Sequence, residues 1–122
     1  MMKTKKILIT GVAGFLGSHL ADKLQKMGHQ IIGSDNMLCG YKDNIPKDIE
    51  FHEVDCCDLK KVQKIMKGVN VVYHCAATAH EGLSVFSPYE ITKNIFLAST
   101  SVFSAAINEK VDRIIFCSSM AR

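Results

Sequence analysis

Short runs of apolar residues, rich in Ile and Val, recur along the 122-residue chain. Each run is too short for a helix, and its hydrophobic residues follow one another without strict alternation with polar ones. This pattern is typical of parallel strands that are covered by helices on both faces. We therefore predict five strands, at residues 6–10, 30–34, 50–54, 69–74 and 113–118.

Segments with helical periodicity follow the first, third and fourth of these strands. Leucines spaced four residues apart mark the apolar face of the first helix. Asp58 is a suitable N-cap for the second, and Ser87 with Glu90 can form a capping box for the third. The apolar faces, which include Leu59 and Ile95, should point inward. We predict helices at residues 14–27, from the Asp58 cap to Gly68, and from the Ser87 cap to about Glu109.

The order of these elements predicts the fold class. Strands separated by helices form parallel sheets with right-handed crossovers, and helices then cover both faces. We predict a single α/β domain over residues 1–122, a Rossmann-like three-layer sandwich with strand order 3-2-1-4-5 that ends before a sixth strand. The longest predicted loop, residues 35–48, is long enough to suggest a function.

Composition and charge exclude several classes of partner. The fifteen basic and twelve acidic residues give a net charge of +3 and are not gathered into a basic patch, so we expect no nucleic-acid partner. No apolar run approaches the roughly 18 residues of a membrane span. The five cysteines lack metal-ligand spacing and are expected to be small reduced core residues, as in the cytoplasm. We predict a cytoplasmic protein without a metal site.

Three glycines lie between the first strand and the first helix. Gly11 would permit a tight turn, Gly14 would leave space for a pyrophosphate, and Gly17 would let the helix pack on the sheet. The helix N-terminus adds free N–H donors and the positive end of a dipole. An ordinary turn is the alternative, but the position between a strand and an amphipathic helix favours a dinucleotide-binding loop.

The ends of the second and fourth strands carry further candidate residues. Asp35 lies about 20 residues beyond the glycine loop, where a carboxylate can accept both adenosine ribose hydroxyls. It would repel a 2′-phosphate, and no arginine lies nearby, so we predict NAD rather than NADP. A plain turn is the alternative role. Ala76 and Ala77 would let the backbone approach the nicotinamide side of the cofactor, the alternative being close helix packing.

These motifs, with Asp55-x-x-Asp58-Leu59, Asn94 and Phe116-Cys117-Ser118-Ser119, resemble the extended short-chain dehydrogenases/reductases, which include NAD-dependent nucleotide-sugar epimerases and dehydratases. The resemblance covers the whole chain. It implies that Ser119 is catalytic and donates a hydrogen bond to the sugar oxygen being oxidised. Asn94 would bind near the nicotinamide ribose, although it could be an exposed helical residue. The implied cofactor contacts are Gly11, Gly14, Phe15, Leu16, Gly17, Asp35, Asn36, Asp58, Leu59, Ala76, Ala77 and Asn94.

The chain also departs from the family pattern. The family's catalytic Tyr-x-x-x-Lys motif should follow the fifth strand. Because the chain ends at Arg122, we expect this tyrosine and lysine, the sixth strand and the substrate region to be missing. Leu97-Ala98 stands where the family usually has Gly-Thr, which puts close packing of the third helix in question.

Two functions fit these observations. The first is the NAD-binding portion of a nucleotide-sugar epimerase or dehydratase, which is inactive alone and whose complete form acts on a small-molecule nucleotide sugar. The second is a non-catalytic protein that binds or senses a dinucleotide. In that case it could be a homo-oligomer whose partner copy covers the open edge of the fifth strand.

Overall fold

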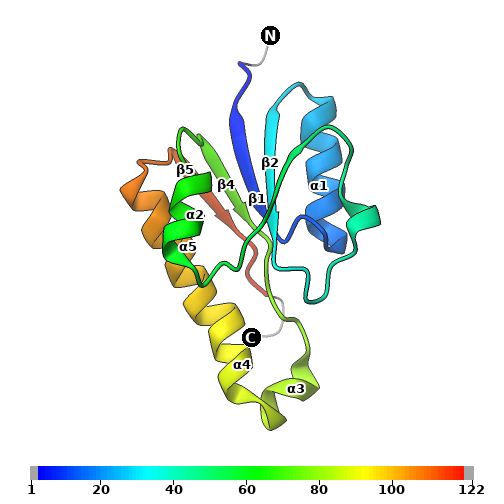
Figure 1. Ribbon diagram of the computed structural model, residues 1–122, viewed down its shortest axis with the longest axis vertical. Helices are drawn as coiled ribbons and strands as arrows, with labels where there is room; N and C mark the ends of the chain where they lie inside the picture. The colour runs from blue at the N-terminus through cyan, green and yellow to red at the C-terminus, as the bar shows by residue number, and fades with distance from the viewer. Residues whose placement is uncertain (1–2, 120–122) are drawn as a thin grey trace.

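The computed structural model describes residues 3–119 and contains a five-stranded parallel sheet of order β3-β2-β1-β4-β5 (Figure 1). The predicted number, direction and order of the strands are therefore confirmed. The strands are β1 (Lys6–Thr10), β2 (Gln30–Asp35), β3 (Glu50–Glu53), β4 (Val71–His74) and β5 (Arg113–Phe116).

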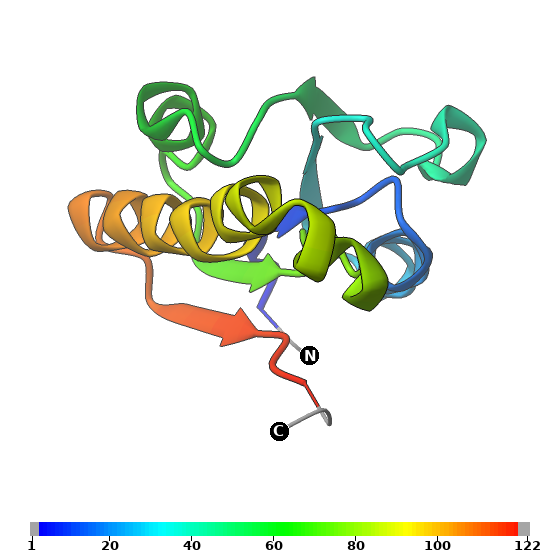
Figure 2. The ribbon, with the colours of Figure 1, turned by 90° about the horizontal axis from the view of Figure 1, so that it is seen from below.

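Helices cover both faces of the sheet. Helix α1 lies on one face, and α2 and α5 lie side by side on the other, as the two views show (Figure 2). The short helices α3 and α4 project beyond the edge at which the strands end. The helices are α1 (Phe15–Lys26), α2 (Leu59–Ile65), α3 (Glu81–Phe86), α4 (Pro88–Thr92) and α5 (Ala98–Asn108), with a 3-10 turn, η1 (Lys42–Asn44), and a π-helical turn, η2 (Lys93–Leu97).

The core consists of two clusters, one on each face of the sheet. Successive residues of β1 point to opposite faces, so Leu8 packs under α2 and α5 while Ile7 and Ile9 pack under α1. All three side chains are buried. Because both faces of the sheet are covered at its centre, β1 and β4 are mostly buried, which accounts for their continuous apolar runs.

Some predicted bounds differ from the structure. β4 begins at Val71, and α2 ends at Ile65 and not at Gly68. β5 ends at Phe116, two residues before the predicted end at residue 118. The reason is that β5 pairs only with β4, and the last paired residues are His74 and Phe116.

The third predicted helix is more complex than expected. It consists of α4, η2 and α5 in succession, and α3 precedes it without having been predicted. Ser87 makes no capping hydrogen bond with its side chain, so that part of the prediction is wrong. Ala98 is buried in the core, so the departure from the family pattern at this position does not prevent close packing.

Several side chains are more exposed than predicted. Leu59, the first residue of α2, and Ile95, in η2, are partly exposed. Cys39 and Cys117 are exposed in loops after β2 and β5, so only part of the cysteine set lies in the core. Across residues 3–119, helices fall short of the length and apolar character that a membrane crossing requires.

Candidate functional site

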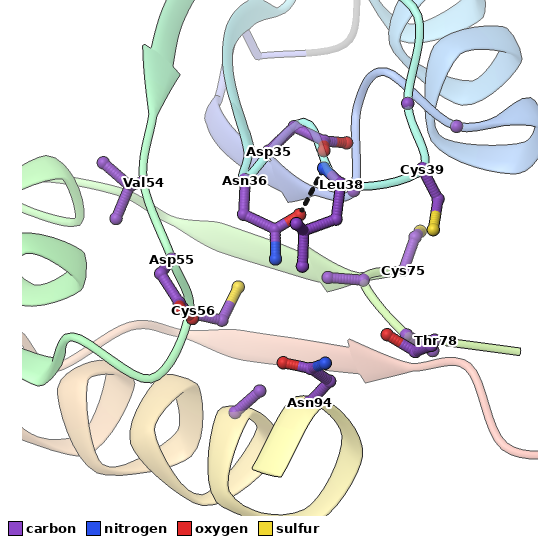
Figure 3. Close-up of a pocket in the computed structure, with 16 residues that line it drawn as sticks. Asp35, Asn36, Leu38, Cys39, Val54, Asp55, Cys56, Cys75, Thr78 and Asn94 are labelled. Carbon is purple, nitrogen blue, oxygen red and sulfur yellow. Dashed lines mark hydrogen bonds between the residues drawn. The ribbon is translucent and has the colours of Figure 1, made fainter. Parts of the chain in front are cut away.

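A pocket lies at the carboxyl edge of the sheet, where β1 to β4 end (Figure 3). β1 is the strand at which the chain order of the sheet reverses, and open parallel sheets bind ligands at this point. The pocket is lined by Gly11, Gly14, Asp35, Asn36, Leu38, Cys39, Gly40, Val54, Asp55, Cys56, Cys75, Ala76, Ala77, Thr78, Asn94 and Ala98.

Gly11 occupies a position that only glycine can fill. Its φ is +72°, in the left-handed region, and a Cβ there would lie 2.8 Å from the backbone nitrogen of Ala76. The absence of a side chain therefore lets the ends of β1 and β4 approach each other. The predicted tight turn is confirmed, and the small residue at position 76 has a reason in the same contact.

Gly17 allows α1 to begin directly against the glycine loop. A Cβ on Gly17 would overlap the carbonyl oxygen of Gly11 and lie 2.8 Å from its carbonyl carbon. The close contact is with the backbone of the loop itself, whereas the prediction placed it at the sheet. Gly14 is the extended N-cap of the 12-residue α1. The resulting cradle of backbone atoms at a helix N-terminus has the chemistry of a pyrophosphate site.

The Asp35 carboxylate lies beside this cradle at the end of β2 and is 8% exposed. It accepts hydrogen bonds from the N–H groups of Ala13 (3.0 Å) and Met37 (2.9 Å), one on each oxygen. Each oxygen keeps a second lone pair, so the carboxylate can still accept hydroxyl groups from a ribose. The backbone bonds fix its orientation toward the pocket.

The long loop between β2 and β3 forms one wall of the pocket. The Tyr41 N–H and the Asn44 side-chain amide both donate to the Ala13 carbonyl, at 3.1 and 3.0 Å. Asn36 accepts from the Leu38 N–H at 3.1 Å, the dashed line in Figure 3. The two bonds to Ala13 hold this loop against the glycine loop, and the Asn36–Leu38 bond lies within the loop.

The loop after β3 contributes two residues that were not among the predicted cofactor contacts, although the acidic groups of the Asp55-x-x-Asp58 motif were expected at the ligand-binding edge of the sheet. Asp55 and Cys56 line the pocket, whereas the predicted residues Asp58 and Leu59 do not. Asp58 instead caps α2 by accepting the Lys61 N–H at 3.1 Å, and this bond is the main cause that lowers the pKa of its carboxyl group. The available signal for Asp55 was its place as the first polar residue after the third strand.

The pocket brings together most of the predicted cofactor contacts. Phe15 and Leu16, which lie outside it, are exposed at the start of α1. Ser119 is exposed in the segment after β5. The cofactor and catalytic roles of these residues, and of Asp58 and Leu59, stay predictions. The predicted residues that line the pocket are Gly11, Gly14, Asp35, Asn36, Ala76, Ala77 and Asn94.

We expected none of the three tyrosines to have a lysine four positions later, but Tyr89 and Lys93 do have this spacing. It precedes β5, whereas the family's catalytic motif is expected after that strand. Tyr89 is 75% exposed on α4, and neither residue lines the pocket. The spacing alone therefore does not make this pair the expected catalytic motif.

Two thiols in the pocket, those of Cys56 and Cys75, are poor nucleophiles. Burial is the main cause that raises the pKa of Cys56 to about 12, and it does the same for Cys75. Both thiols are therefore protonated at neutral pH.

Within residues 3–119, no group of three or more His, Cys, Asp or Glu side chains could hold a metal ion. The glycine cradle and the Asp35 carboxylate would suit a ligand with phosphate and hydroxyl groups.

Comparison with known proteins identifies the family. The model of the NAD dependent epimerase/dehydratase family matches residues 7–121. The chain belongs to this family. The family's cofactor is NAD, as the carboxylate at Asp35 and the absence of a nearby arginine predicted.

Individual members resemble the chain over most of its length. UDP-glucuronic acid decarboxylase 1 of Danio rerio is 32% identical over 84% of the chain, which spans 24% of that relative. The structure of UDP-glucose 4-epimerase from Thermotoga maritima with UDP-glucose has a TM-score of 0.91 and 33% identity, covering 93% of this chain and 38% of that one. The Thermus thermophilus UDP-glucose 4-epimerase complex with NAD has a TM-score of 0.89 and 30% identity, with coverages of 93% and 37%. The chain thus spans about a quarter to two fifths of the length of these family members.

Proposed function

We propose that this chain binds NAD in the carboxyl-edge pocket and forms the cofactor-binding part of an enzyme that converts sugar nucleotides. The observation that carries the proposal is the side-chain-free cradle at Gly11, Gly14 and Gly17 beside the buried carboxylate of Asp35. The first feature suits a pyrophosphate and the second suits a ribose. Membership of an NAD-dependent family supports the same ligand.

The residues would hold the cofactor along the edge of the sheet. The N-terminus of α1 would face the pyrophosphate, and Asp35 would accept the adenosine ribose hydroxyls. Asn94 and the backbone at Ala76 and Ala77 line the other end of the pocket, which fits the nicotinamide half. When bound, NAD supplies a reversible acceptor for hydride from a sugar carbon. In that reaction Ser119 would donate a hydrogen bond to the sugar oxygen.

The named relatives suggest the substrate class. The Thermotoga maritima structure contains UDP-glucose, and the Danio rerio relative is named for UDP-glucuronic acid. We infer that the substrate is a UDP-sugar. Because the chain is expected to be inactive alone, size-exclusion chromatography with light scattering separates this function from the alternative, a non-catalytic NAD-binding or sensing role. A well-defined dimer or larger assembly would favour the alternative, and a compact monomer would count against it.

Calorimetric titration of the chain with NAD and with NADP tests the binding proposal. We expect NAD to bind more tightly than NADP. Replacing the carboxylate in Asp35→Ser removes hydrogen bonds from a charged group, so NAD affinity should fall by about 10- to 100-fold. Discrimination against NADP should fall as well, because the repulsion of the 2′-phosphate is lost.

Asp43→Ser is the matched control, because Asp43 is an exposed acidic residue in η1 of the same loop. It should bind NAD like the unmodified chain. Thermal unfolding of each variant shows whether the fold is kept. Unchanged NAD affinity in a folded Asp35→Ser variant would refute the ribose-binding role, and failure of the unmodified chain to bind either dinucleotide would refute the proposal as a whole.

A further inference from the structure

A buried histidine links two walls of the pocket. His74, the last residue of β4, is 2% exposed. Its Nδ1 lies 2.7 Å from the hydroxyl oxygen of Thr10, and its Nε2 lies 2.9 Å from the hydroxyl oxygen of Ser99. The imidazole therefore connects the last residue of β1 to the first turn of α5.

The direction of each hydrogen bond between Thr10, His74 and Ser99 follows from the groups that flank them. The Ser99 hydroxyl lies 2.6 Å from the carbonyl oxygen of Ile95, which can only accept, so the Ser99 proton is donated there. Ser99 Oγ must then accept from the Nε2–H of His74. At the other ring nitrogen, Nδ1 accepts from the Thr10 hydroxyl, whose oxygen accepts the Ala76 N–H at 3.2 Å. A neutral imidazole with its proton on Nε2 satisfies every group.

The surroundings of the ring favour the neutral form. Burial lowers the pKa of His74 to about 4. The ring stacks on Phe116 with centroids 6.0 Å apart, and it forms a T-shaped contact with Phe103 at the same centroid distance. The imidazole is thus uncharged at neutral pH, and its orientation is fixed by neighbours on β5 and α5.

The series of hydrogen bonds from Thr10 through His74 and Ser99 to Ile95 has its two ends at opposite sides of the pocket. Thr10 immediately precedes the glycine loop. Ile95 belongs to η2, the π-helical turn in which Ala98 N–H is shared between the carbonyls of Lys93 and Ile95. The same turn carries Asn94, whose side chain points into the pocket (Figure 3). π-helical turns are often found at functional sites, where they set the direction of a side chain.

We propose that His74 is a positioning residue: through Ser99 it holds the π-helical turn in register with the glycine loop, so that Asn94 faces the bound NAD. The inference rests on the proposed function, because it assigns a role in holding the same cofactor. It assigns no contact between His74 and NAD. The imidazole acts through the Ser99 hydroxyl at one end and the Thr10 hydroxyl at the other.

Ser99→Ala removes the hydroxyl that joins His74 to Ile95. Ser99 is half-buried, and the fold should tolerate this change. We expect NAD affinity to fall by about three- to tenfold, the loss that one hydrogen bond can cause. Ser104→Ala is the matched control, because the Ser104 hydroxyl donates to the Thr100 carbonyl at 2.8 Å in the same helix and takes no part in the hydrogen bonds of His74. Ser104→Ala should keep full affinity, and Ser99→Thr, which keeps the hydroxyl, should restore most of it.

The histidine tautomer provides a readout that does not depend on NAD. In long-range ¹H–¹⁵N NMR spectra, His74 of the unmodified chain and of Ser104→Ala should carry its proton on Nε2. Ser99→Ala should lose this single tautomer. A proton on Nδ1 in the unmodified chain, or equal NAD affinity in Ser99→Ala and Ser104→Ala, would overturn the inference alone. Failure of the unmodified chain to bind NAD would overturn the proposed function, and this inference with it.

Discussion

The glycine-loop side of the pocket, residues 10–17 with Asp35, combines side-chain hydrogen bonds with backbone contacts so close that they exclude a Cβ. The helical side, residues 81–98, has side-chain hydrogen bonds, and a Cβ at its glycine, Gly82, would meet no atom within 4 Å. On the first side, Gly11 and Gly17 leave no space for a Cβ. On the second, the carbonyls of Lys93 and Ile95 accept from the side chains of Cys57 and Ser99. Every residue of α3 is exposed.

The two sides of the site should therefore differ in rigidity. Steric exclusion at a glycine is local and allows one backbone path, so the glycine-loop side should be rigid before any ligand binds. The helical side has few buried apolar contacts and should change shape more readily. NAD would then bind between a preformed wall and an adjustable one.

The largest expected effect is on the glycine-loop side. In Gly17→Ala the new methyl group would collide with the backbone of Gly11, which cannot rotate away as a side chain could. We expect the free energy of unfolding to fall by about 3 kcal/mol, or folding to fail. Denaturant unfolding followed by circular dichroism measures the change.

Gly82→Ala is the matched control on the helical side. Gly82 lies in α3, and a Cβ there would meet no atom within 4 Å. Because alanine favours helices over glycine, stability should stay the same or rise by up to about 1 kcal/mol. Equal losses in the two variants would show that the two sides do not differ in the way described.

The next effect concerns pH and the histidine that joins the two sides. The pKa of His74 falls from an ordinary 6.5 to about 4 in the folded chain. Between these values the unfolded chain binds a proton that the folded chain excludes, so stability is complete above about pH 6.5 and falls as the pH drops toward 4. From about pH 7 to pH 5, where carboxylates stay mostly ionised, the loss should be about 2 kcal/mol.

Urea unfolding at several pH values would measure this slope. His74→Gln should flatten it, whereas His19→Gln, which changes an exposed histidine of α1, should leave it in place. A slope that persists in His74→Gln would mean that other groups cause the pH dependence.

The sequence was sufficient where local chemistry determines structure. The five strands and the roles of Gly11 and Asp58 follow from runs of apolar residues, turn geometry and capping, and the strand order followed from the Rossmann-like fold class. It was insufficient where partners are distant along the chain. The π-helical turn depends on hydrogen bonds from Cys57 and from Ser99, whose own partner is His74, and no periodicity in residues 87–109 encodes it.

The candidate site divides in the same way. Asp35 could be predicted because its spacing from the glycine loop is set by one helix and one strand. Asp55 and Asp58 were both expected at this edge of the sheet, but only Asp58 was named as a cofactor contact. Both are acidic residues after β3, and only the path of the backbone decides which one lines the pocket. Loop paths of this kind depend on tertiary contacts that a local pattern does not contain.

The smallest expected effect compares two N-caps that the sequence presented as equivalent. The Asp58 side chain caps α2, whereas the Ser87 side chain makes no capping hydrogen bond to α4 on the helical side. Asp58→Ala should therefore lower the midpoint of thermal unfolding by roughly 3 to 6 °C, and Ser87→Ala should leave it almost unchanged. Differential scanning calorimetry of both variants measures the contrast. A loss in Ser87→Ala as large as in Asp58→Ala would show that the helical side is held by its cap after all, because in that case the Ser87 hydroxyl must bond to the first turn of α4 in solution.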